Sequence, residues 1–153
     1  GSNRLVSFCN RVLVMMKTFF TFVFAVMLVG CASSNNGTLY QQLNGEQGIE
    51  KLVDSFINQI GRDEQILAYF KQTNVAHFRQ GFITHLCSVT NGPCEYKGDN
   101  MVDIHTGMNI PEKDFNRVVE LLINAMDEQQ IPQTVQNKIL SRLAPLRSEV
   151  IDI

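Results

Sequence analysis

The sequence lacks the short motifs on which most hydrolytic and phosphate-binding sites depend. It contains no HExxH pair, no CxxC pair, no glycine-rich phosphate loop and no GxSxG elbow. Histidine is also scarce, because the chain has only His77, His85 and His105. These absences leave little basis for hydrolytic chemistry.

Acidic residues are missing from positions 1–38, whose only charged residues are Arg4, Arg11 and Lys17. The whole chain has 13 basic and 15 acidic residues, so positions 39–153 have 10 and 15 and a formal charge of −5. This negative charge argues against nucleic acid as a partner. Apolar residues make up 44% of the chain and charged residues 18%, which excludes intrinsic disorder and allows one domain with a hydrophobic core.

Positions 1–30 have the order of a secretory signal preceded by extra residues. The first two residues, Gly-Ser, are typical of a cloning scar, and the natural start is predicted at Met15 or Met16. Lys17 then precedes an apolar run over 19–30, and the Leu-Val-Gly-Cys sequence that ends at Cys31 resembles a bacterial lipobox. Cleavage there would make Cys31 a lipidated N-terminus.

Two other interpretations of this segment remain open. The run over 19–30 would span only about 18 Å as a helix, against a hydrocarbon core of ~30 Å, but extension back to Val12 would allow an uncleaved membrane anchor. An ordinary buried helix is the third interpretation. Residues 31–37 are predicted to be a polar tether and residues 38–153 the folded domain. We expect an exported lipoprotein that is tethered to the membrane and faces the periplasm, or a cytoplasmic protein if the segment is no signal.

From Thr38 onward, apolar residues recur with a helical period, and no stretch alternates long enough to predict a strand. The sequence therefore predicts an all-α domain. Helices are expected over 38–44, over 49–60 with Gly61 as C-terminal cap, over 66–70, from the N-cap Asn74 to about 89, over 101–107, and after Pro111 and Pro132. An irregular loop is expected over 91–100. One side of the 75–89 helix is expected to be buried through Val75, Phe78, Phe82, His85, Leu86 and Val89.

His105 is the histidine with the clearest potential for chemistry. Met101 and Met108 lie four residues before it and three after it, so they share its helical face and direct its imidazole toward apolar surface. A neutral imidazole there could bind a metal through one nitrogen while the other donates to a backbone carbonyl. The alternative is a core histidine without a ligand, because one histidine does not define a metal site.

A resemblance to a known family favours the metal-binding interpretation of His105 over the core histidine. It rests on Leu39-Tyr40, Leu43-Asn44-Gly45, Ile49-Glu50, Val53, Phe56, Tyr69-Phe70, Gly92-Pro93, Tyr96, Gly98, Met101, His105, Gly107, Phe115 and Ala144-Pro145-Leu146. In order and spacing these residues resemble the bacterial group I truncated haemoglobins. The resemblance implies a truncated globin, a two-over-two helical sandwich around haem b, with His105 as the proximal iron ligand. It also implies diatomic gas ligands, namely dioxygen, nitric oxide and carbon monoxide.

The resemblance assigns further residues to the haem. Phe70 matches a phenylalanine that stacks on the porphyrin, so haem contact is favoured over the alternative, an ordinary core residue. The rest of the pocket would be lined by Met101, Phe115, Val118, Leu122, Ile139 and Leu143. Arg79, Thr73 and Tyr96 are candidates for contact with the propionates, with a solvated surface side chain as the alternative for Arg79.

The chain departs from the family on the opposite, distal side. Many relatives place Tyr and Gln or His there as hydrogen-bond donors, whereas the matching positions hold Ile57, Phe78 and Phe82. None of these side chains can donate, so we expect fast dioxygen release and easy autoxidation. His85 is the nearest polar group; His85 or His77 could supply a sixth iron ligand, or both could simply pack or face solvent.

Cys87 and Cys94 lie seven residues apart across the Asn91-Gly92-Pro93 turn. In an exported protein they could form a disulfide, whereas in the cytosol they would remain thiols. Zinc binding by these cysteines and His85 is disfavoured, because residues two apart on a helix point in nearly opposite directions.

Two functional hypotheses follow. The first is a membrane-tethered globin that binds diatomic gases, for oxygen binding or transport or for detoxification of nitric oxide by dioxygenation, which would require an electron-donating reductase. The second is a haem-free helical lipoprotein that acts as an interaction module and uses His105 for no chemistry.

Overall fold

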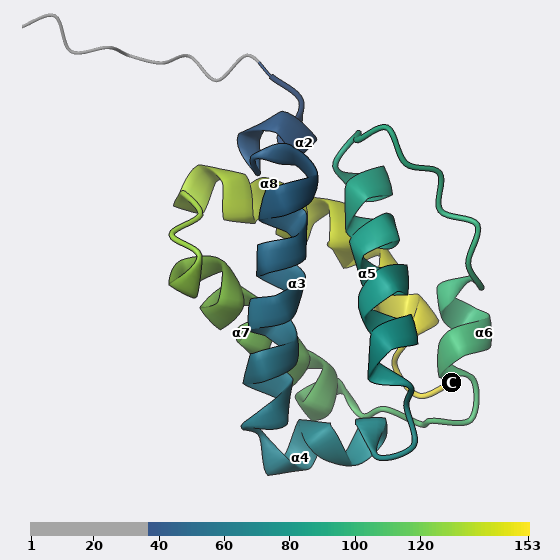
Figure 1. The fold of residues 1–153 in the computed structure, drawn as a ribbon. Coiled ribbons are helices and arrows are strands. Elements are labelled where there is room, and N and C mark those ends of the chain that lie inside the picture. Colours follow the sequence, from purple (N-terminus) through teal and green to yellow (C-terminus); the bar gives the residue numbers. More distant parts are fainter. Residues whose placement is uncertain (1–36) are drawn as a thin grey trace, which may run out of the picture. The chain divides into compact units, whose positions relative to one another are not determined.

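The computed structural model describes residues 37–153, which form helices joined by short loops (Figure 1). The elements are α2 (Leu39–Gln42), α3 (Gly45–Gly61), α4 (Glu64–Leu67), η1 (Ala68–Phe70), α5 (Val75–Val89), α6 (Met101–His105), α7 (Glu112–Glu128), α8 (Gln133–Leu143) and η2 (Ala144–Glu149). Within this range the only β-pairing is one bridge, between Ile110 and Ile151. The all-α prediction is confirmed. The predicted signal segment and Cys31 lie outside the described residues, and no described helix has the length and apolarity to cross a membrane.

Side chains at the helix starts explain where several elements begin. Thr38 forms a capping box with Gln41 ahead of α2, and Asp63 caps α4 by accepting from the Ile66 N–H at 2.9 Å. Asn74 caps α5 as predicted, with its side chain accepting from the His77 N–H at 3.1 Å. Each cap satisfies backbone donors that a helix start otherwise leaves without partners.

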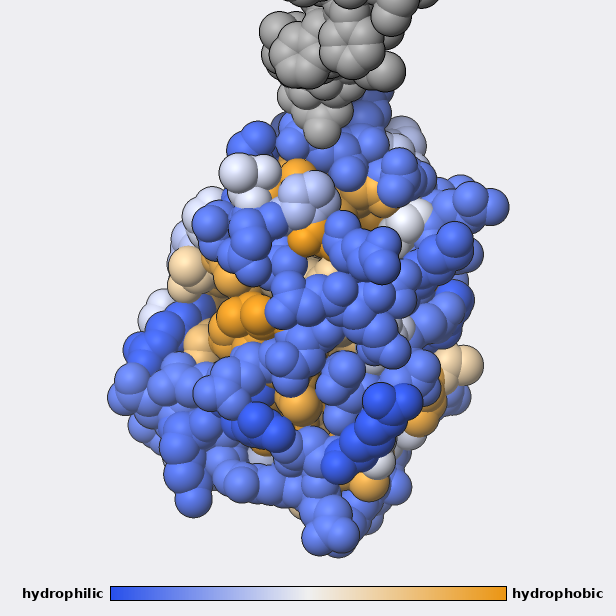
Figure 2. All heavy atoms as spheres, turned by 90° about the vertical axis from the view of Figure 1, so that its left-hand side faces the viewer, coloured by the Kyte–Doolittle hydropathy of each residue, from blue (hydrophilic) through white to orange (hydrophobic). Residues whose placement is uncertain are grey.

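Two pairs of helices enclose the core. α3 packs against α5 and α7, and Figure 1 shows α3 and α5 side by side in one layer with α7 and α8 in the other. One side of α3 is buried and belongs to the same core cluster as buried residues of α7 and α8. From α3 the cluster takes Ile49, Leu52, Val53, Phe56 and Ile60, and from α7 and α8 it takes Leu121, Leu122, Ala125, Met126, Val135 and Ile139. This is the two-over-two arrangement that the resemblance implied. The side of the domain turned to the viewer in Figure 2 is mainly hydrophilic, with apolar atoms in separate patches.

Two details of the helix predictions are wrong. Gly61 is the last residue of α3 rather than its cap, because Arg62 caps the helix with right-handed backbone angles that need no glycine. Val75 is 54% exposed, since it is the first residue of α5 and no core side chain covers it.

The turn after α5 packs tightly against α2. The Gly92 N–H donates to the Cys87 carbonyl at 2.8 Å, and the Tyr40 N–H donates to the Thr90 carbonyl at 2.8 Å. A Cβ atom at Gly92 would lie 2.6 Å from both the Cys87 sulfur and the Tyr40 ring. Glycine is therefore required at position 92 by close approach.

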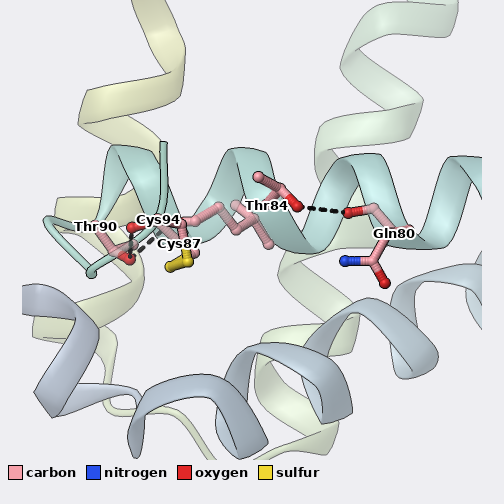
Figure 3. Close-up of a disulfide and its surroundings, with 6 residues drawn as sticks. Gln80, Thr84, Cys87, Thr90 and Cys94 are labelled. Carbon is pink, nitrogen blue, oxygen red and sulfur yellow. Dashed lines mark hydrogen bonds between the residues drawn. A yellow bond between two sulfur atoms is a disulfide. The ribbon is translucent and has the colours of Figure 1, made fainter. Parts of the chain in front are cut away.

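A disulfide joins Cys87, buried near the end of α5, to Cys94 in the following loop (Figure 3). The sequence left either a disulfide or two free thiols possible for these cysteines, and the structure contains the disulfide. The bond fixes the start of the 90–100 loop, which leads to α6, on the end of α5. Thr90 strengthens the same helix end, because its hydroxyl donates to the Leu86 carbonyl at 2.7 Å.

Removal of this disulfide should lower the stability of the domain. We expect Cys94→Ser to reduce the free energy of unfolding by about 2 kcal/mol, since a cross-link over so short a loop restricts the unfolded chain. Urea unfolding followed by circular dichroism measures the change. Dithiothreitol should destabilise the wild type by a similar amount and leave Cys94→Ser unaffected; a wild type indifferent to the reductant would contradict the prediction.

Candidate functional site

His105 is the last residue of α6, and it is half-buried. Its Nδ1 lies 2.7 Å from the Met101 carbonyl oxygen. Because a carbonyl can only accept, Nδ1 carries the proton in this contact, and in a neutral imidazole Nε2 is then the nitrogen with the free lone pair. The structure thus holds the imidazole in the tautomer that binds a metal through Nε2.

The short helix that carries His105 is fixed at both ends by side chains. At its start, the Asn100 side chain accepts from the Asp103 N–H at 2.9 Å. At its end, the Thr106 hydroxyl donates to the Val102 carbonyl at 2.6 Å. Five residues are too few for a stable isolated helix, so these contacts help to maintain the geometry around His105.

Four phenylalanine rings form a connected series between α3, α5 and η1. The centroid distances are 5.3 Å for Phe56–Phe82, 5.8 Å for Phe78–Phe82 and 5.1 Å for Phe70–Phe78. Phe70, Phe78 and Phe82 pack against the core but are only partly buried. The structure therefore brings Phe70, the predicted porphyrin contact, together with the two distal phenylalanines as one aromatic surface.

The remaining predicted lining residues differ in burial. Leu122 and Ile139 are 5% and 0% exposed and belong to the packed core. A second group is half-buried, and it consists of Met101, Phe115, Val118 and Leu143. Phe115 also lies under the Arg147 guanidinium, 5.8 Å from the ring centroid.

His85 continues the Phe78 and Phe82 side of α5 and is half-buried. Its ring meets the Tyr96 ring edge-on, with centroids 5.0 Å apart. Desolvation by burial lowers the pKa of His85, which favours its neutral form. The Tyr96 hydroxyl donates to the Asp99 carbonyl at 2.9 Å, and burial raises the pKa of Tyr96. This places an imidazole and a phenol on the side of α5 that carries Phe78 and Phe82.

The predicted propionate partners lie in less favourable places. The Arg79 guanidinium binds both oxygens of Asp54, at 2.6 and 2.9 Å, and this hydrogen bonding lowers the pKa of Asp54. Arg79 would have to share or release this partner to bind a propionate. Thr73, a second propionate candidate, is exposed, and so is His77, which was a candidate for the sixth iron ligand.

The distal positions contain no hydrogen-bond donor on their side chains. Ile57, Phe78 and Phe82 are half-buried and pack against the core. A ligand beside these three residues would contact only apolar side-chain atoms.

One buried polar cluster was not predicted. Asp114, at the start of α7, is 5% exposed and accepts from the Tyr69 hydroxyl at 2.6 Å and from Gln65. The hydrogen bond to Asp114 raises the pKa of Tyr69 to about 12. This cluster ties the element that carries Phe70 to α7. Tyr69 and Asp114 are 45 residues apart, and no local pattern in the sequence connects them.

The donor set fits a haem better than a bare metal ion. Among residues 37–153, no group of three His, Cys, Asp or Glu side chains could hold a metal together. A porphyrin supplies four nitrogen ligands itself and needs one axial imidazole and apolar surface from the protein. His105 offers one such imidazole, and Phe70, Phe78 and Phe82 offer partly buried apolar surface.

Comparison with known proteins defines the class. Residues 38–152 match the bacterial-like globin family. The group 1 truncated haemoglobin of Tetrahymena pyriformis is 28% identical over 114 residues, which are 74% of this chain and 94% of that protein. The corresponding protein of Tetrahymena thermophila is 31% identical over 91 residues, 60% of this chain and 75% of that protein.

Solved structures agree with this assignment. The Fe(III) form of the Tetrahymena pyriformis truncated haemoglobin has a TM-score of 0.73 at 27% identity, and covers 76% of this chain and 100% of its own. The cyanomet 2/2 haemoglobin of Synechococcus has a TM-score of 0.71 at 19% identity, covers 75% of this chain and 98% of its own, and supports the fold alone. The chain belongs to the bacterial-like globin family. Within that family it is a group 1 truncated globin.

Proposed function

We propose that this globin binds haem b through His105 and uses it to bind diatomic gases. The observation that carries the proposal is the His105 tautomer, in which Nδ1 donates to the Met101 carbonyl and Nε2 keeps its lone pair. Phe70, Phe78 and Phe82 would contact the porphyrin. The iron, once bound, supplies the site to which a gas molecule attaches. The absence of a CxxCH attachment motif from the sequence supports haem b rather than a c-type haem.

Absorption spectra of the full chain purified with a haem supply test this proposal. We expect a Soret band at one haem per chain that shifts when the reduced protein meets carbon monoxide. A colourless but cooperatively folded protein would contradict the proposal and favour an interaction module.

The distal residues favour small, uncharged ligands. Dioxygen gains partial negative charge at a haem and benefits from a donor, whereas carbon monoxide and nitric oxide depend on one much less. Ile57, Phe78 and Phe82 provide apolar contact only. We therefore propose weak retention of dioxygen together with ordinary binding of carbon monoxide and nitric oxide.

We further propose that the protein is exported and tethered to a membrane through lipidated Cys31. The lipobox-like sequence supports this, and so does the Cys87–Cys94 disulfide, because disulfides persist in oxidising compartments. In a bacterial host, Cys31→Ala should move the protein out of the membrane fraction, while Ser34→Ala, in the neighbouring polar tether, should not. An unchanged distribution for Cys31→Ala would argue against lipid tethering.

A further inference from the structure

Residues 151–153 are paired with the segment that follows His105. The Gly107 and Asn109 N–H groups both donate to the Ile153 carbonyl, at 3.0 and 3.1 Å. The Asp152 N–H donates to the Ile110 carbonyl at 3.1 Å, and Ile110 and Ile151 form a parallel bridge. Figure 1 shows the same proximity, with the C-terminal end beside the lower end of α6.

The pairing begins two residues after the proposed iron ligand. The Met108 N–H also donates to the His105 carbonyl at 3.0 Å, so the turn after α6 is bonded on one side to His105 and on the other to Ile153. Any displacement of Ile153 would therefore be passed to the backbone of His105 through a few rigid peptide groups.

Backbone angles show that this junction has a demanding geometry. Gly107, Asn109 and Asp152 all have positive φ angles, of 84°, 47° and 56°. Left-handed conformations are unfavourable for residues other than glycine, and they persist where surrounding contacts impose them. The hydrogen bonds between the two segments are contacts of this kind.

Side chains hold η2, from which residues 151–153 continue, in the same region. Arg147 forms an ion pair with Glu112 and lies over the Phe115 ring. η2 also packs against α6 directly. Residues 151–153 thus follow directly on η2, whose position is fixed by these contacts, and pair with the segment after His105 in a defined register.

We propose that residues 151–153 position the proximal histidine: their main chain holds the turn after α6 and thereby sets the placement of the His105 imidazole against the iron. The inference rests on the proposed haem binding by His105.

The test compares the full chain with a variant that ends at Val150. Loss of the three hydrogen bonds should lower and broaden the iron–histidine stretching band in resonance Raman spectra of the reduced protein. It should also accelerate haem transfer to apomyoglobin about tenfold, because the ligand is held in a less defined position. Hydrogen exchange of the Gly107 and Asn109 amides, measured without haem, should become much faster.

Two further variants keep the experiment decisive. Ile153→Ala retains the carbonyl that accepts both hydrogen bonds and should keep the wild-type stretching band. Insertion of Gly-Gly after Val150 keeps all residues but breaks the register of the pairing, so it should have the same effect as the deletion. It replaces the deletion as the test if the shorter chain does not fold.

The outcomes separate this inference from the proposed function. A full chain that binds no haem would overturn haem binding, and the amide exchange data would still report the contact. A full chain that binds haem, with an unchanged band and unchanged haem loss in both register-breaking variants, would overturn the positioning role alone.

Discussion

The variant His105→Gly is expected to lose the Soret band of the full chain, and added imidazole is expected to restore it in part. The reason is that His105 is the proposed iron ligand, with Nδ1 committed to the Met101 carbonyl and Nε2 available for the metal. Free imidazole can occupy the space of the deleted ring. Haem titration of the variant with and without imidazole, followed by absorption, measures both effects.

Matched controls come from the other two histidines. His77 is exposed, so His77→Gly should leave the Soret band intact. His85→Gly should keep the band in the reduced protein, because His85 belongs to α5 and not to the segment that carries the proposed ligand. If His105→Gly kept full haem affinity without imidazole while His85→Gly lost it, the assignment of the proximal ligand would be wrong.

Hydrogen-bond donors introduced on the distal side are expected to slow the release of dioxygen. Ile57→Tyr and Phe82→Gln each place a donor where the side chain is now apolar and half-buried. A neutral hydrogen bond contributes about 0.5–1.5 kcal/mol, so each variant should slow dissociation by about two- to tenfold, and the pair by more. Stopped-flow measurement of dioxygen dissociation from the reduced protein gives the rates.

Isosteric variants separate the donor from the change in shape. Ile57→Phe has the ring of Ile57→Tyr without its hydroxyl, and Phe82→Met approximates the length of Phe82→Gln without its amide. Both should release dioxygen as fast as the wild type, and carbon monoxide dissociation should change little in all four variants. Equal slowing by the donor and control variants would show that packing, and not hydrogen bonding, governs the rate.

The helices could be predicted from the sequence because local patterns mark where a helix begins and which of its sides is apolar. The stripe from Ile49 to Ile60 has one buried side, and Asn74 caps α5, so both features follow from residues near each other in the chain. Val75 shows the limit of this reasoning, since it fits the apolar stripe and is nevertheless exposed. Periodicity indicates which side of a helix faces the core but not how far the core extends along it.

Contacts between distant segments could not be predicted in this way. The Tyr69–Asp114 hydrogen bond joins residues 45 apart, and the Ile153 carbonyl meets Gly107 and Asn109 through main-chain atoms that every sequence possesses. The same limit applies to Arg79, whose partner Asp54 lies on another helix. The resemblance identified His105, but the proton on its Nδ1 followed only from the position of the Met101 carbonyl.

That carbonyl has a consequence for the electronic character of the proposed ligand. Where a carboxylate accepts from the outer nitrogen of an axial histidine, it draws the proton toward itself and makes the ring a stronger electron donor, approaching imidazolate. The uncharged Met101 oxygen exerts a much weaker pull. A ring of this modest basicity would stabilise an oxidised metal less than an imidazolate would, which suits the proposed gas binding better than peroxidase chemistry.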